Sequence, residues 1–563
     1  MIYSDKIRVV ALLLCLAFFN AYAQTSPGSP AWDSYHSSSE TVKLIRRWTT
    51  TYPELTKLYS IGKTLKGTDL MVLEITNKST GAAKEKPGYY YDGNIHAGEL
   101  TGAEVALHFA WYVLSNYQSN IRIKDLLDTH VLYIRPKFNP DGADIALSTP
   151  NHLRSTPRPY DEDGDGLLDE DPGDDLNGDG FITQMRVESV NGKWQLSKED
   201  PRLLVRRTAD NITGPFYDLY KEGIDDDQDG LLNEDGLGGI DMNRNFPRNW
   251  GMEFEQKGAG PYPLSEPETR ATIEFLSTHR NITGVFHGHT SGGFLFRLPS
   301  TTSWDDYDLR DQQLILELSD QYAKTTGQPV RPSYSNPKYH RHGTLISWSY
   351  WDFGVPAFVP EFWRAGKDYD NDGRVSDEEK LKWNDNKLDG EGFVKWSVYY
   401  HPQLGNVEIG GWKRKFTLQN PPPSMLKKEI EKYVPWMLWL AEISPKIEVI
   451  DIHTETVGKS GMVKVTATIQ NTGYLPTNIT QRALDNRTAQ PVRVFFTLDG
   501  ATVVAGKPMT VLGHLAGSRG ANGPADSSRK VEFVVHPDGK NPKAFLKVVS
   551  EKGGTVMKEI NLN

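Results

Sequence analysis

The pattern of hydrophobic and polar residues in the first three quarters of the chain predicts helices and strands in alternation. Apolar residues recur at helical spacing from residue 39 to 59, and the pair Tyr52-Pro53 is typical of a helix end. A second helix-compatible stretch covers Gly102–Leu114. This alternation of helices and strands indicates an α/β fold, with a mixed central sheet flanked by helices. The predicted strands are Asp69–Ile75, Tyr89–Tyr91, His130–Ile134, Gly284–Phe286 and Ala357–Val359.

After Ser444-Pro445 the pattern changes to short strand-like segments separated by Gly, Asn, Asp and Pro, with no long helix among them. Such spacing is typical of a small all-β sandwich. We therefore place a domain boundary near residue 445, between an α/β domain over residues 33–443 and a sandwich over residues 446–563. The predicted strands of the sandwich are Lys446–Ile452, Met462–Gln470, Val492–Leu498, Val531–His536 and Ala544–Val549.

The N-terminus has the composition of an export signal. Lys6 and Arg8 precede the apolar run Val9–Phe19, and the small-residue segment Ala21-Tyr22-Ala23 follows it. This order predicts a signal peptide over residues 1–23, and the run is too short to cross a bilayer core of about 30 Å. We expect a secreted or periplasmic protein with no membrane association after cleavage. No large pro-segment separates this signal from the first predicted helix, so we expect no proteolytic activation.

Composition excludes several classes of function. Cys15 is the only cysteine and lies in the predicted signal, so disulfides and thiol nucleophiles are excluded from the mature chain. A net charge of −10 argues against a nucleic-acid partner, because nothing in it would neutralise a phosphate backbone. We expect a monomer.

Histidine and glutamate residues follow two of the predicted strands. His96 and Glu99 come after Tyr89–Tyr91, on a turn that can direct an imidazole and a carboxylate at one point. His287 and His289 come after Gly284–Phe286, at the strand end where α/β sheets build their sites. A zinc site needs a third ligand besides such a pair, and a position left open for water. An HxxE pair alone is a weak signal, and its interpretation depends on the rest of the chain.

Six sequence elements in one order make residues 35–440 resemble the zinc carboxypeptidase family typified by pancreatic carboxypeptidase A, in its bacterial secreted branch. The resemblance implies a zinc-dependent carboxypeptidase that acts on the C-termini of peptides or proteins. The elements are His96 with Glu99, the turn Asn139-Pro-Asp-Gly142, the pair Asn243-Arg244, His287 or His289, Tyr339, and Glu361.

The resemblance also implies roles for these residues. Zn²⁺ would be held by His96, Glu99 and His289. We prefer His289 to His287 because His289 opens a His-Thr run that ends in Arg, as in the family. Glu361 would be the general base, with its pKa raised by a dry environment.

Substrate binding is assigned by the same resemblance. Asn243 and Arg244 would bind the terminal carboxylate, since an arginine fork suits a carboxylate. Tyr339 lies nine residues before a Trp-Ser-Tyr segment, as in pancreatic-type relatives, and is expected to contact substrate. Ile346 is in register with the floor of the specificity pocket, which favours apolar or aromatic C-terminal residues.

An arginine is needed to stabilise the oxyanion of the tetrahedral intermediate. The family places it in an Arg-x-x-Arg-like stretch after the Asn-Pro-Asp-Gly turn. Arg158 is our choice after a one-residue shift, and Arg154 and Arg186 stay as alternatives.

Three other functions are compatible with parts of this pattern. A deacylase of N-acyl amino acids uses a similar ligand set, and a cell-wall peptide hydrolase of the same superfamily has a related substrate. A secreted binding protein without activity would lack a ligand or the base, and none is missing here.

A calcium loop of the DxDxDGx5E type begins at Asp368, directly after the segment of Glu361. Half-copies of the pattern begin at Asp161, Asp175 and Asp225 and lack the final Glu. We expect structural Ca²⁺ to hold loops that frame the site. The predicted ligand positions of the complete loop are Asp368, Asp370, Asp372, Arg374, Ser376 and Glu379.

Overall fold

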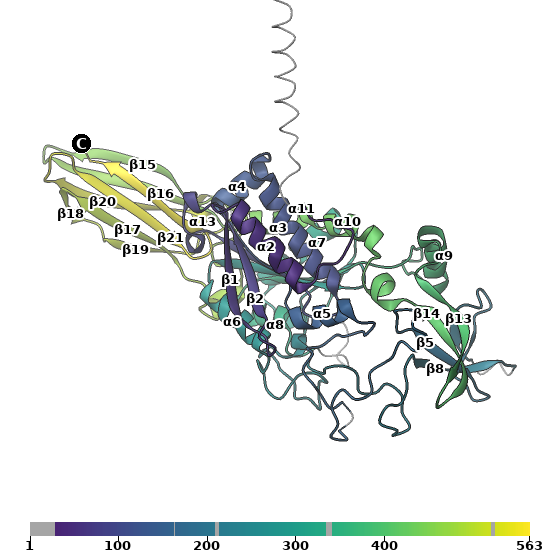
Figure 1. The fold of residues 1–563 in the computed structure, drawn as a ribbon. Coiled ribbons are helices and arrows are strands. Elements are labelled where there is room, and N and C mark those ends of the chain that lie inside the picture. The colour runs from purple at the N-terminus through teal and green to yellow at the C-terminus, as the bar shows by residue number, and fades with distance from the viewer. Residues whose placement is uncertain (1–28, 163, 209–212, 334–340, 520–523, 563) are drawn as a thin grey trace, which may run out of the picture.

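The computed structural model describes residues 29–562, apart from 163, 209–212, 334–340 and 520–523. An eight-stranded mixed sheet forms the centre of the larger domain (Figure 1), as the strand and helix pattern predicts. In spatial order its strands are β1 (Thr56–Lys63), β2 (Asp69–Ile75), β4 (Val131–Arg135), β3 (Gly88–Gly93), β9 (Ile282–Thr290), β12 (Ala357–Phe362), β10 (Phe294–Arg297) and β11 (Val330–Pro332).

The four middle strands of this sheet, β4, β3, β9 and β12, run parallel to one another. β1 and β2 extend the sheet antiparallel on one side, and β10 pairs antiparallel with β12 on the other. Because the parallel strands end at the same edge, residues that follow them gather there.

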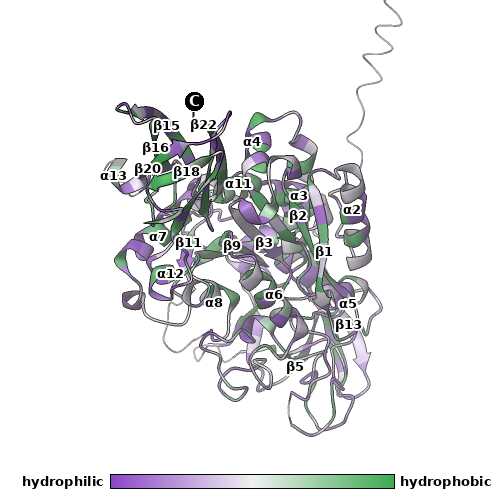
Figure 2. Ribbon diagram, turned by 90° about the vertical axis from the view of Figure 1, so that its left-hand side faces the viewer, coloured by the Kyte–Doolittle hydropathy of each residue, from purple (hydrophilic) through white to green (hydrophobic). Residues whose placement is uncertain are grey.

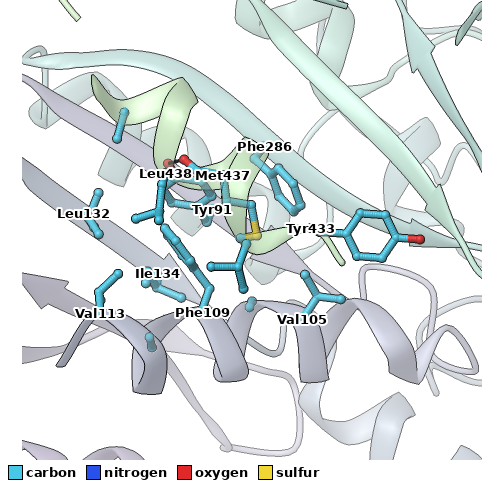
Figure 3. Packing of buried hydrophobic residues seen from close by; sticks show 14 of the residues in the cluster. Tyr91, Val105, Phe109, Val113, Leu132, Ile134, Phe286, Tyr433, Met437 and Leu438 are labelled. Carbon is cyan, nitrogen blue, oxygen red and sulfur yellow. Dashed lines mark hydrogen bonds between the residues drawn. The ribbon is translucent and has the colours of Figure 1, made fainter. Parts of the chain in front are cut away.

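Helices cover both faces of the sheet. Val105, Phe109 and Val113 of α3 recur at helical spacing and point at the sheet, where Tyr91 packs against Phe109 (Figure 3). The helices of the larger domain are α2 (Ser38–Thr51), α3 (Leu100–Asn116), α4 (Ile121–Thr129), α5 (Pro140–Ser148), α6 (Pro267–Thr278), α7 (Leu309–Thr326), α8 (Leu345–Trp351), α9 (Asp377–Leu388), α10 (Pro423–Glu431) and α11 (Val434–Glu442).

A second sheet of six antiparallel strands lies beside the central one and was not predicted from the sequence. Its strands come from two insertions that are far apart in the chain, and the four strands of the first insertion have only 3 to 6 residues each. In spatial order they are β13 (Phe393–His401), β14 (Gly405–Trp412), β5 (Gln184–Glu188), β8 (Phe216–Lys221), β6 (Trp194–Leu196) and β7 (Leu204–Arg206).

The C-terminal residues form two four-stranded sheets that enclose a common apolar core, so the expected β-sandwich is confirmed. Figure 2 shows β15, β16 and β20 side by side in one of them. α12 (Gln481–Asp485) and α13 (Pro524–Ser527) are short. The strands are β15 (Ile447–Val457), β16 (Met462–Asn471), β17 (Val492–Asp499), β18 (Ala501–Ala505), β19 (Met509–Gly513), β20 (Ser528–Pro537), β21 (Lys543–Ser550) and β22 (Gly554–Asn561).

The sandwich packs against the larger domain through specific polar contacts. The carboxylate of Asp311 in α7 accepts hydrogen bonds from the backbone N–H groups of Gln481 and Arg482, at 2.7 and 3.0 Å. Arg280 forms an ion pair of 3.0 Å with Glu551. The boundary lies between the end of α11 and the start of β15.

The described residues contain no helix that is both long and apolar enough to cross a membrane. The predicted signal peptide over residues 1–23 lies outside the described part of the chain.

Candidate metal centre

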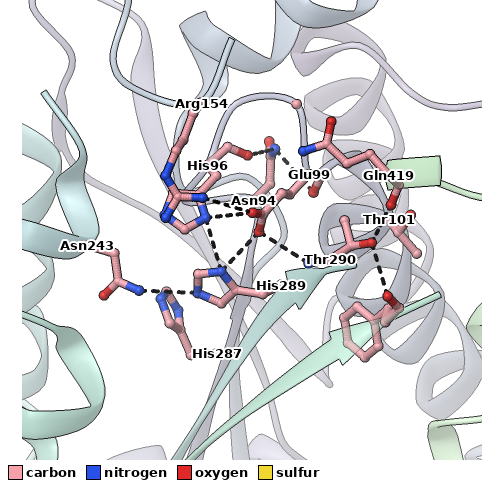
Figure 4. Close-up of polar contacts among 12 residues, drawn as sticks. Asn94, His96, Glu99, Thr101, Arg154, Asn243, His287, His289, Thr290 and Gln419 are labelled. Carbon is pink, nitrogen blue, oxygen red and sulfur yellow. Dashed lines mark hydrogen bonds and ion pairs between the residues drawn. The ribbon is translucent and has the colours of Figure 1, made fainter. Parts of the chain in front are cut away.

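The ends of β3 and β9 bring His96, Glu99 and His289 together (Figure 4). His96 follows β3, and Glu99 is the residue from which α3 begins. His289 is the next-to-last residue of β9, which pairs in parallel with β3. The three side chains therefore converge because two adjacent parallel strands end at the same edge.

Two glycines, Gly93 and Gly102, allow the start of α3 to approach these strand ends closely. A Cβ atom on Gly93 would lie 2.2 Å from the backbone oxygen of Gly102, and one on Gly102 would lie 2.7 Å from that of Gly288. No larger residue fits at these crossings without moving backbone. The glycines thus set the distance between the loop of Glu99 and the strand of His289.

The three side chains form a donor set suited to one divalent ion. One donor atom from each lies within 4.8 Å of the others, and all three residues are buried. The Nδ1 atoms of His96 and His289 lie 2.7 and 2.9 Å from the Glu99 carboxylate and 3.1 Å from each other. Two imidazoles and a carboxylate are a common ligand set of catalytic zinc.

The electrostatics of the cluster favour the protonation states that bind a cation. Burial lowers the pKa of His289 to about 3, so its imidazole is neutral. Burial alone would raise the pKa of Glu99, but His96 and His289 hold it well below its usual range. A neutral imidazole and an ionised carboxylate are the forms that a metal ion binds.

Residues behind the cluster orient the ligands. Nε2 of His96 lies 3.1 Å from Oδ1 of Asp241, which leaves Nδ1 free to face the cluster. His287 points elsewhere, since its Nδ1 lies 2.5 Å from Asp92 in the buried interior. The geometry thus favours His289 over His287 as the third ligand.

Glu361 lies beside the ligands on β12, with its Cα paired to that of His289 across the sheet. Burial raises the pKa of Glu361 well above its ordinary value, and the negative charge of Glu99 raises it further. Arg154 and Arg341 act in the opposite direction. A carboxyl group with a raised pKa next to a metal cluster is suited to accept and return a proton.

The position of Arg158 does not support its assignment as the oxyanion-stabilising residue. Its Nη1 lies 2.9 Å from Glu266, and it is not among the residues that line the cavity at the metal cluster. Arg186 is also remote, since it pairs with Glu408 in the six-stranded sheet. Arg154 lines the cavity, with its guanidinium 3.0 Å from Asp241 and 3.5 Å from Glu99. Of the three arginines that the sequence offers for this role, only Arg154 lines the cavity.

A cavity of about 530 Å³ opens at the cluster and contains the residues expected to bind substrate. Asn243 and Arg244 lie on its wall in a short 3-10 helix, Met242–Arg244, and Nδ2 of Asn243 is 3.5 Å from Nε2 of His289. Ile346 of α8 also lines the cavity. Tyr339 lies outside the described residues.

A second cavity of about 950 Å³ adjoins the first. His152, Arg414 and Leu418 line both cavities, so the two are neighbours on this side. The walls of the second include Trp194, Tyr220 and other residues of the six-stranded sheet. The insertions therefore build a large recess next to the metal centre.

The loop that begins at Asp368 turns tightly around its first carboxylate. Asp368 accepts hydrogen bonds from the backbone N–H groups of Asn371 and Gly373, at 2.6 and 2.9 Å. Gly373 has a φ of 87°, which a side chain would disfavour. Carboxylate oxygens of Asp368, Asp370 and Glu379 lie within 4.8 Å of one another. Asp372 is not part of this group and accepts instead from the backbone N–H of Arg374, while Ser376 caps α9.

The half-copies share the first turn of this loop. Asp161, Asp175 and Asp225 each accept hydrogen bonds from a glycine backbone N–H five residues later. In the third copy Asp225, Asp227 and Asp229 converge, and Asp227 also lies near Glu170 of the first.

The chain belongs to the zinc carboxypeptidase family. The model of this family, peptidase M14, matches residues 41–385. Residues 446–561 match a family described as a domain of unknown function. The first match covers the central sheet, the metal cluster and Glu361.

Named relatives resemble parts of the chain. Carboxypeptidase Z of Mus musculus is 34% identical over 116 residues, which are 20% of this chain and 18% of that protein. Carboxypeptidase D of Homo sapiens is 28% identical over 145 residues, 25% and 10% of the two chains. The chain therefore matches less than a fifth of the length of these relatives.

Two solved structures align over more of the chain. Thrombin-activatable fibrinolysis inhibitor aligns with 74% of this chain and 79% of its own, at 17% identity and a TM-score of 0.46. Carboxypeptidase A from Helicoverpa armigera aligns with 65% and 72%, at 16% identity and a TM-score of 0.41.

Sequence reasoning missed two residues of the site, Asp241 and Arg341. Asp241 comes two residues before Asn243, so its place behind His96 follows from the same segment. Arg341 lines the cavity beside Ile346 but has no counterpart among the motifs that the sequence displays. The sequence does contain one signal for Arg341: it is a charged residue two positions after Tyr339, which is expected to contact substrate.

Proposed function

We propose that this protein is a zinc-dependent carboxypeptidase that hydrolyses the last peptide bond of peptides or proteins. The observation that carries the proposal is one cavity that joins three buried metal donors, the half-buried Glu361, and the pair Asn243 and Arg244. Hydrolysis at a chain terminus requires these three functions close together: a Lewis acid site, a proton carrier and a receptor for the terminal carboxylate.

His96, Glu99 and His289 would hold the zinc ion. When bound, zinc lowers the pKa of a water molecule and polarises a carbonyl oxygen. Glu361 accepts a proton from the attacking water and returns it to the leaving amine, which its raised pKa favours. Arg154 stabilises the negative charge that develops on the carbonyl oxygen, since its guanidinium lines the same cavity.

The terminal carboxylate pairs with Arg244. Nη1 of Arg244 donates to the backbone oxygen of Asn243 at 2.7 Å, and its side chain is 13% exposed, so the guanidinium is held at the wall. Leu345 N–H donates to Oδ1 of Asn243 at 3.1 Å, which orients the amide of Asn243. A fixed carboxylate receptor selects chain ends over internal peptide bonds.

The second cavity is lined by His152 and Arg414 but not by Ile346, and it has room for residues upstream of the scissile bond. The proposal therefore places the peptide chain along this recess and the terminal residue near Ile346.

The experiment that tests the proposal is amino-acid release from blocked peptides, with and without a chelator. We expect release of the C-terminal residue, loss of activity on chelation and recovery with zinc, because the donor set serves catalysis only with an ion bound. Release of acyl groups from N-acyl amino acids with no activity on peptides would favour the deacylase alternative. Release that chelation leaves unchanged would refute the zinc proposal.

We further propose that calcium binds the loop from Asp368 to Glu379 and stabilises it. Asp370→Ala removes one carboxylate from the group, so the rise in melting temperature on adding calcium should fall. A ligand at a hundredfold excess over its Kd stabilises by about 2.7 kcal/mol. Asp499→Ala, at an exposed position in β17, is the matched control and should keep the wild-type response. An identical calcium response in Asp370→Ala and wild type would contradict the site.

The proposal also covers the organisation of the chain. Residues 1–23 direct export, residues 33–443 form the catalytic unit, and residues 446–563 form an accessory sandwich. We propose that the exported protein is a monomer.

A further inference from the structure

Arg341 is a positively charged residue of the cavity, and the proposed reaction gives it no role. It lines the same cavity as the metal ligands and Arg244. Its Nη1 donates to the backbone oxygen of Ser333 at 2.9 Å, and its guanidinium lies 4.8 Å from the centre of the Phe296 ring. These contacts fix the side chain but neutralise none of its charge.

Three other arginines line the cavity, and two of them, Arg154 and Arg244, each face a carboxylate, while Arg414 lies where the second cavity adjoins the first. Arg154 is 3.0 Å and Arg244 is 4.0 Å from Asp241. Within the described part of the chain, Arg341 has no carboxylate closer than 4.0 Å. Its positive charge also acts on its neighbours: burial lowers the pKa of Arg244, and Arg154 and Arg341 lower it further. An arrangement of like charges is stabilised when an anionic ligand binds between them.

The surroundings of Arg341 form the end of the cavity that would receive the terminal side chain. Phe296 and Val359 are paired across β10 and β12, and Thr344 and Ile346 come from the start of α8. None of these four residues lines the second cavity, which shares His152, Arg414 and Leu418 with the first. Phe296, Val359 and Ile346 supply apolar surface, beside which Arg341 places a fixed charge.

We infer that Arg341 selects peptides whose C-terminal residue is acidic, Glu or Asp. This inference rests on the proposed carboxypeptidase function and gives it a substrate class. The α-carboxylate of such a residue pairs with Arg244 and its side-chain carboxylate with Arg341, while the methylene groups contact Ile346 and Val359. A preference for acidic C-terminal residues replaces the expectation, based on Ile346 alone, that apolar or aromatic C-terminal residues are preferred.

Other terminal side chains fit this site less well. An apolar side chain would remove water from the Arg341 guanidinium without replacing it by an acceptor, and Lys or Arg would place a like charge beside it. Gln has the shape of Glu without the charge, so the ratio of kcat/KM for Glu-terminated and Gln-terminated peptides measures the charge alone.

The test uses zinc-loaded full-length protein and blocked tetrapeptides that differ only in the last residue, Glu, Gln, Leu or Lys. We expect kcat/KM to be about 10- to 100-fold higher for Glu than for Gln, with Lys the poorest, as a hydrogen bond between two charged groups implies. Arg341→Met should reduce the Glu-to-Gln ratio to about one. The lost charge also acts on Glu361, but this effect is common to both peptides and cancels in their ratio. Arg341→Lys should restore part of the ratio.

Arg331→Met is the matched control. Arg331 is exposed on β11, stacks on Phe294 and is not among the lining residues of the cavity, so the Glu-to-Gln ratio should stay as in wild type. Activity on the Leu peptide reports whether Arg341→Met is folded, and if this activity is lost, the Arg341→Lys ratio decides.

Two kinds of failure are distinguishable. Faster release of Leu than of Glu by wild type, or an unchanged Glu-to-Gln ratio in Arg341→Met, overturns the role of Arg341 and leaves the carboxypeptidase proposal intact. No release of any terminal residue from any of the four peptides overturns both.

Discussion

Glu361→Gln is expected to lower kcat by about 10²- to 10⁴-fold, the range that a positioned proton carrier contributes. Glutamine keeps the shape of the side chain but has no carboxylate to accept the proton of the attacking water. The ligands His96, Glu99 and His289 are unchanged, so the zinc content should stay the same. Steady-state kinetics on a blocked peptide and metal analysis of the same sample check both expectations.

The stability of this variant gives a second readout. Because the pKa of Glu361 is raised in the folded protein, its ionised form is disfavoured there, and metal-free wild type loses stability as the pH rises above the ordinary value for Glu. Metal-free Glu361→Gln should lack this loss and melt at the same or a higher temperature near neutral pH. Glu431→Gln, at an exposed position of α10, controls for loss of a carboxylate and should retain full activity. Substantial peptide hydrolysis by Glu361→Gln would exclude the proposed base.

His289→Ala is expected to abolish stoichiometric zinc binding and, with it, peptide hydrolysis. The change removes one of three buried donors, and the remaining His96 and Glu99 leave the ion without a closed set of protein ligands. Zinc per chain after dialysis, measured beside kcat/KM, tests this.

Comparing His289→Ala with His287→Ala tests which of the two histidines binds zinc. His287 lies two residues away on the same strand, but its Nδ1 contacts Asp92 and not Glu99. Its loss leaves a buried carboxylate unpaired, which costs about 3–5 kcal/mol, so the melting temperature should fall while zinc content is kept. Zinc lost from His287→Ala and retained by His289→Ala would reverse the ligand assignment.

Local sequence signals placed most secondary structure of the central sheet. The predicted strand Asp69–Ile75 matches β2 residue for residue, and Gly102–Leu114 lies inside α3. The helix predicted from residue 39 ends at Thr51, directly before the pair Tyr52-Pro53 that marks a helix end in the sequence. The last residues of the predicted stretch belong instead to β1. The pattern there was ambiguous because β1 is only partly buried and its polar positions do not alternate strictly.

Local sequence signals do not predict which distant strands pair with each other. β14 pairs with β5 through residues more than two hundred positions apart, and no local pattern indicates which distant strand is the partner. The arginine assignment failed for a related reason. Arg154 and Arg158 have the same chemistry and nearly the same place in the sequence, and only the contacts of Arg158 with Glu266 and of Arg154 with Asp241 separate them.

The sequence by itself determined the family, the order of the site motifs and the division into an α/β domain and a sandwich, because each of these depends on local composition and spacing. Only the tertiary structure decided which of two histidines faces Glu99, which arginine reaches the cavity, and that Arg341 lines it. Those facts depend on what packs around each side chain. His287 and His289 lie on the same face of β9, and only their different neighbours, Asp92 and Glu99, separate them.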